Sequence, residues 1–64
     1  MRKRVRERLL GHLAGAGGPV VWTGRKGLRK QKFNSETAPI ADLVLNDLVE
    51  EEKVTFDGTK VALV

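Results

Sequence analysis

The sequence of 64 residues carries 12 Lys and Arg residues against 8 Asp and Glu residues, a net charge of +4, and it has no cysteine. One small domain over residues 1–64 is expected, because compact domains rarely split below about 100 residues. The lack of cysteine excludes a disulfide framework and a thiolate metal site. No apolar run approaches the roughly 18 residues of a membrane span, so we expect a cytoplasmic protein with no membrane partner.

The charges are segregated along the chain. Residues 1–32 hold ten bases and one acid, a net charge of +9, whereas residues 33–64 hold two bases and seven acids, a net charge of −5. Such asymmetry within one small chain favours a polyanionic partner for the basic half.

Residues 2–14 are predicted to form an amphipathic helix. Val5, Leu9 and Leu13 recur at helical spacing, and Leu10 widens the apolar stripe. Three glycines and a proline within residues 15–19 are typical of a helix end, so we expect the helix to stop near Ala14. The β-branched and aromatic run at 19–23 predicts one short strand.

Residues 24–34 read GRKGLRKQKFN, with five bases and two glycines. This composition leaves two structures open, an exposed loop or a short helix. A second long helix is predicted to begin at Ser35 or Thr37, which are suitable N-cap residues, with Pro39 in its first turn. Its apolar residues cover more than half of its circumference, which is typical of a central core helix. They are Ile40, Ala41, Leu43, Val44, Leu45, Leu48 and Val49.

The C-terminal stretch predicts a β-hairpin. Asp57-Gly58 is a favoured two-residue type I′ turn. This turn would pair Phe56 with Thr59, Thr55 with Lys60 and Val54 with Val61. The buried face would then hold Val54, Phe56, Val61 and Leu63. The short strand at 19–23 is expected to add a third strand, because an isolated hairpin is marginal.

The order helix, short strand, basic connection, core helix and hairpin resembles a minimal winged helix-turn-helix domain, an α+β fold. The most specific part is residues 45–64, where a leucine-rich helix end runs directly into a hairpin with an Asp-Gly tip. In this family the third helix usually enters the DNA major groove and the wing contacts the backbone or the minor groove. The resemblance implies Ser35, Glu36 and Thr37 at the groove-facing start, with Thr59 and Lys60 on the wing.

The basic segment at 25–32 is expected to contact phosphates, because five bases in eight residues exceed what solubility needs. We therefore expect a small DNA-binding regulator of transcription, or an accessory factor, that binds duplex DNA and is nucleoid-associated. The candidate binding residues are Arg4, Arg8, Arg25, Lys26, Arg29, Lys30, Lys32, Ser35, Thr37 and Lys60. The acidic core helix opposes this mode, because Asp42, Asp47 and Glu50 would bring negative charge toward phosphates, and only Asn46 there suits base edges.

Two other classes stay open. An RNA-binding module would use the basic segment and Trp22, although composition favours a core position for this residue. A protein-interaction module would act as an adaptor, self-associate or bind an acidic partner. Enzyme activity is not expected, because no nucleophile, base or metal set converges, and we expect no cofactor and no metal. His12 is expected to be a helix-surface residue without a role.

Overall fold

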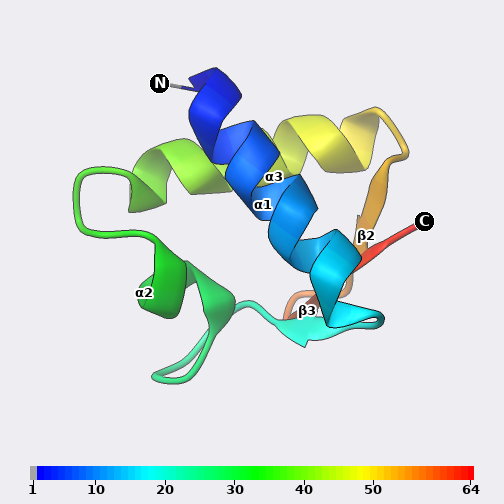
Figure 1. Ribbon diagram of the computed structural model, residues 1–64, viewed down its shortest axis with the longest axis horizontal. Coiled ribbons are helices and arrows are strands. Elements are labelled where there is room, and N and C mark those ends of the chain that lie inside the picture. Colours follow the sequence, from blue (N-terminus) through cyan, green and yellow to red (C-terminus); the bar gives the residue numbers. More distant parts are fainter. Residues whose placement is uncertain (1) are drawn as a thin grey trace.

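The computed structural model describes residues 2–64, which form three helices and a three-stranded antiparallel sheet (Figure 1). The strand order is β1-β3-β2, so the last strand in the chain lies at the centre of the sheet. This arrangement confirms the predicted α+β class and the predicted third strand. In chain order the elements are α1 (Arg2–Ala16), β1 (Val20–Val21), α2 (Leu28–Lys32), α3 (Ala38–Glu50), β2 (Val54–Phe56) and β3 (Lys60–Leu63).

The core lies where α1 crosses α3 and both helices pack on the sheet (Figure 1). Val5, Leu9 and Leu13 are buried on α1, as their spacing predicts. The helix continues two residues past the predicted end at Ala14, and Gly17 then takes a left-handed φ of 71°. From α3 the core receives Ala38, Ala41, Val44, Leu45 and Leu48.

The basic connection contains a short helix, α2, which is one of the two alternatives that its composition allowed. The helix is anchored at both ends, because Leu28 and Phe33 are buried although the residues between them are polar. The Phe33 ring packs on the indole of Trp22, with 6.2 Å between the ring centroids and an angle of 52° between the ring planes. Trp22 is only 3% exposed, which is the core position that composition favours.

The start of α3 differs in its capping from the prediction. Thr37 is the N-cap, as expected, but its side chain makes no capping hydrogen bond to the helix. Instead Asn34 organises the preceding turn, because its Oδ1 accepts the backbone N–H of Glu36 and of Thr37, both at 2.9 Å. The Thr37 hydroxyl also donates to this oxygen at 3.0 Å.

The predicted hairpin register was wrong, because the observed pairing is shifted from it by two residues. Phe56 pairs with Val61, so the two central turn residues are Gly58 and Thr59 rather than Asp57 and Gly58. Gly58 has a φ of 98° and Thr59 has no positive φ, which excludes the predicted type I′ turn and matches glycine at the first position of type II′. The cause is the Asp57 carboxylate, which accepts the N–H of Lys60 at 2.7 Å and of Thr59 at 2.8 Å. These bonds also lower the pKa of Asp57.

A shift by two residues keeps each side chain on its predicted face, because strands alternate with a period of two. Val54 and Val61 are accordingly buried. Phe56 and Leu63 were also expected to be buried, and this was wrong, because they are 36% and 41% exposed. Each is the last residue of its strand.

The C-terminus of α3 contains a strained residue. Glu52 has a φ of 61°, and the N–H groups of Glu52 and Lys53 bond to the carbonyls of Val49 and Leu48. This is the Schellman pattern, in which the left-handed position usually holds glycine. A left-handed conformation costs an L-residue roughly 1–2 kcal/mol.

Glu52→Gly is therefore expected to raise the free energy of unfolding by about 0.5–1 kcal/mol, after the greater chain entropy of glycine is subtracted. Urea denaturation followed by circular dichroism measures this change. Glu52→Ala is the control, because it removes the charge but keeps the strain, and its effect should stay within a few tenths of a kcal/mol. Equal stabilisation by both variants would assign the effect to charge instead of to the backbone.

Candidate nucleic-acid interface

Three arginines of the basic half form ion pairs with acidic residues of the same chain. Arg2 pairs with Asp47 at 3.1 Å, Arg6 with Glu51 at 2.7 Å and Arg29 with Asp42 at 2.9 Å. All three acids belong to α3 or to its C-cap. These pairs neutralise most of the acidic charge of α3, the charge that opposed its approach to phosphates.

The Arg6–Glu51 pair has the fork geometry typical of strong ion pairs. Nη1 and Nη2 of Arg6 donate to Oε2 and Oε1 of Glu51, both at 2.7 Å. These hydrogen bonds raise the pKa of Arg6 and lower the pKa of Glu51. The pair ties the start of α1 to the end of α3.

Other basic side chains gather near the start of α3. Arg4 and Arg8 of α1 line a hollow of about 180 Å³ together with Phe33 and Thr37. Nη1 of Arg8 also donates to the carbonyl of Lys32 at 3.4 Å, which brings the end of α2 beside α1. The positive end of the α3 dipole lies in the same region.

Lys30 extends this region on the other side of Phe33. It lines a hollow of about 520 Å³ together with Phe33, Asn34, Ser35 and Pro39. Within residues 2–64 no carboxylate lies within ion-pair distance of any of the four bases that border the start of α3. We call these four residues the basic surface: Arg4, Arg8, Lys30 and Lys32.

The structure thus brings together seven of the ten predicted binding residues, namely the basic surface with Arg29, Ser35 and Thr37. Arg29 differs from the other bases in this region because it forms an ion pair with Asp42. Arg25 and Lys26 are exposed in the turn before α2, where the Lys26 carbonyl accepts a hydrogen bond from the Gln31 side chain. Lys60 lies on the sheet, opposite Val21 of β1.

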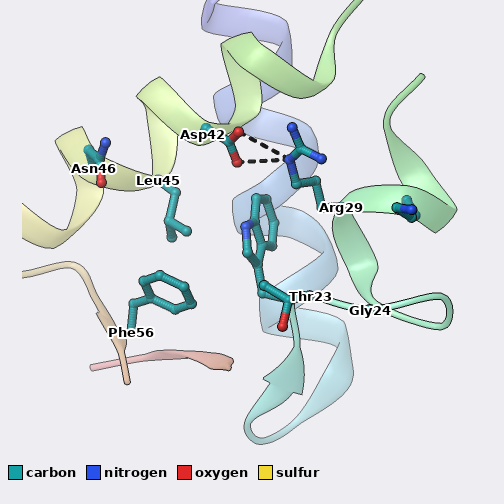
Figure 2. Close-up of a pocket in the computed structure, with 9 residues that line it drawn as sticks. Thr23, Gly24, Arg29, Asp42, Leu45, Asn46 and Phe56 are labelled. Atoms are coloured by element: carbon teal, nitrogen blue, oxygen red, sulfur yellow. Dashed lines mark hydrogen bonds and ion pairs between the residues drawn. The ribbon is translucent and has the colours of Figure 1, made fainter. Parts of the chain in front are cut away.

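Sequence reasoning missed two features near this interface. Asn34, which holds the turn before α3, has a local signal, because asparagine side chains often bond the backbone two or three residues later. A groove between α2, α3, β2 and the segment that follows β1 has no such signal, because its walls come from distant segments (Figure 2). The Arg29–Asp42 pair borders this groove, with Leu45 and Phe56 on another side (Figure 2).

Among residues 2–64 there is no group of three or more His, Cys, Asp or Glu side chains that could hold a metal ion. No helix within this range is long and apolar enough to cross a membrane. His12 is half-buried on α1. Comparison of the chain with protein-family models, curated proteins and solved structures found no match.

Proposed function

We propose that the chain is a winged-helix domain that binds nucleic acid through the basic surface. The layout supports the fold assignment, because a hairpin directly follows the third helix and β1 pairs with its second strand. The same order and pairing are compatible with the winged-helix family. The domain would act by binding, as a DNA-binding regulator or accessory factor, rather than as an enzyme.

The observation that carries this proposal is the grouping of four unpaired bases near the start of α3. Arg2, Arg6 and Arg29 pair with the acids of α3 and its C-cap, whereas the basic surface keeps four positive charges without a carboxylate partner among residues 2–64. A concentration of unpaired positive charge on one side is the electrostatic footprint of phosphate binding. The partner is therefore a polyanion, and duplex DNA is the first candidate.

The mode of binding is expected to be dominated by phosphate contacts. The outward face of α3 carries Pro39, Leu43, Asn46 and Glu50, of which only Asn46 has the amide that reads base edges. Because phosphates carry no sequence information, the affinity for nucleic acid should depend steeply on salt concentration and weakly on base sequence.

A second candidate function is protein docking through α3. Leu43 is 52% exposed on the outward face of this helix, and an exposed leucine favours contact with another protein.

The double variant Lys30→Ala/Lys32→Ala tests the proposal. Both residues are exposed, so the fold should persist. Binding to a labelled duplex, measured by fluorescence anisotropy at several salt concentrations, should weaken about 10-fold or more at low salt. The slope of log affinity against log salt should become shallower by about 2, roughly one unit per lost phosphate contact.

The matched control is Lys3→Ala/Lys53→Ala, which removes the same charge from exposed positions outside the basic surface. This variant should keep most of the affinity and the slope. Equal losses in both variants would show attraction by net charge alone. A parent protein that binds neither duplex nor single strand at 50 mM salt would overturn the proposal, and concentration-dependent mass in light scattering would then support the protein-docking function.

A further inference from the structure

The groove beside the basic surface has a volume of about 420 Å³, which falls in the range of roughly 300–1,000 Å³ that is typical of small-molecule sites. It is bounded by α3, by the segment that follows β1, by α2 and by β2 (Figure 2). The residues that line it are Trp22, Thr23, Gly24, Arg29, Lys30, Asp42, Leu45, Asn46 and Phe56.

One wall of the groove is apolar and aromatic. Phe56 is 36% exposed and lies beside Leu45, which is itself buried (Figure 2). An exposed phenyl ring at the edge of a groove offers a flat surface on which any nucleobase can stack. Trp22 also lines the groove, but it is 3% exposed and packed on Phe33, so its role there is to support the wall.

The polar groups of the groove match the edge of a base and a phosphate. Asn46 is exposed and carries both a hydrogen-bond donor and an acceptor, the combination that reads base edges. Nε of Arg29 donates to both carboxylate oxygens of Asp42, at 2.9 and 3.1 Å, so the negative charge of Asp42 is balanced by Arg29 (Figure 2). Lys30 has no carboxylate within ion-pair distance in residues 2–64 and supplies the net positive charge.

We propose that this groove binds one unstacked nucleobase together with its phosphate. The base stacks on Phe56, Asn46 contacts its edge and Lys30 holds the phosphate. The proposal deepens the proposed function and rests on it, because Lys30 lines both this groove and the hollow beside Ser35. A strand bound along the basic surface thus continues into the groove, which favours a duplex with an unpaired end over a fully paired one.

Single nucleotides test the groove without the rest of the interface. The probes are AMP and CMP, with ribose 5-phosphate as the control that lacks a base. Trp22 is the only tryptophan and lines the groove, so its fluorescence reports occupancy. Saturation-transfer NMR of the nucleotide protons is the second readout. The nucleotides should bind with roughly millimolar affinity, and ribose 5-phosphate about 10-fold more weakly.

Variants then locate the bound nucleotide. Phe56→Leu keeps an apolar side chain but removes the ring, and it should weaken AMP binding about 10-fold. Adenine and cytosine present different edges to Asn46, so AMP and CMP should differ in affinity. Asn46→Ala should reduce this difference. Lys32→Ala is the matched control, because Lys32 does not line the groove, and it should weaken duplex binding while AMP binding stays unchanged.

The outcomes separate this inference from the proposed function. If oligonucleotides bind but AMP and CMP bind no better than ribose 5-phosphate, the groove proposal is wrong and the proposed function stands. If AMP binds and Phe56→Leu removes that binding while no oligonucleotide binds, the groove takes free nucleotides and the proposed function is wrong. If Phe56→Leu leaves AMP binding unchanged, the base does not stack there and the inference is overturned.

Discussion

Leu48→Ala is expected to lower the free energy of unfolding by about 2–5 kcal/mol. Leu48 is completely buried, and it belongs to the core in which α1 and α3 meet. A domain of this size is rarely stabilised by more than about 3–5 kcal/mol, so the variant should be largely unfolded without denaturant. Far-UV circular dichroism and urea titration measure the loss.

Leu43→Ala is the matched control, because it makes the same change on the same helix at a position that is 52% exposed. Its effect should remain within about 0.5 kcal/mol, as for most surface substitutions. If the two variants had similar unfolding midpoints, the buried face of α3 would be assigned wrongly.

Gly27→Ala is expected to destabilise the protein by about 1–3 kcal/mol or more, the cost of overpacking. A Cβ atom at this position would lie 2.4 Å from the carbonyl oxygen of Trp22 and 2.6 Å from that of Thr23. Backbone atoms cannot move aside as a flexible side chain can, so the turn before α2 must shift. The N–H of Arg29 bonds to the same Trp22 oxygen, and that contact should weaken as well.

Gly11→Ala provides the opposite control. Gly11 lies within α1, and a Cβ atom there would meet nothing within 4 Å. Alanine in a helix interior is favoured over glycine by about 1 kcal/mol, so this variant should be more stable than the parent. Thermal unfolding of both variants compares them directly. A Gly27→Ala protein as stable as the parent would show that the turn before α2 does not pack closely on the Trp22 backbone.

The charge segregation of the sequence has a structural role as well as the proposed binding role. The basic half predicts a polyanionic partner, yet three of its arginines bond instead to the acids of α3 and its C-cap. Exposed ion pairs contribute little to stability, with a median of about 0–1 kcal/mol each. The pairs also change the distribution of surface charge, because they neutralise three arginines while the basic surface has no carboxylate partner among residues 2–64.

Several elements of the fold follow from signals that are local in the sequence. The apolar spacing of Val5, Leu9 and Leu13 predicts α1 and its buried face, and the leucine-rich run before residue 50 predicts α3. Alternation in residues 54–63 predicts the hairpin and the faces of its strands. These features depend on the 3.6-residue and two-residue periods of the backbone, which neighbouring residues are enough to reveal.

Other features depend on contacts between residues that are distant in the sequence, and these became visible only in the folded chain. Residues 28–32 form a helix whose ends are held by the buried side chains of Leu28 and Phe33. The composition of this segment is equally compatible with a loop. The ion pairs of Arg2 and Arg6 join residues 45 positions apart. The groove likewise combines four parts of the chain, namely the segment after β1, α2, α3 and β2. No local pattern specifies which charges or walls will meet, because packing of the core sets those distances.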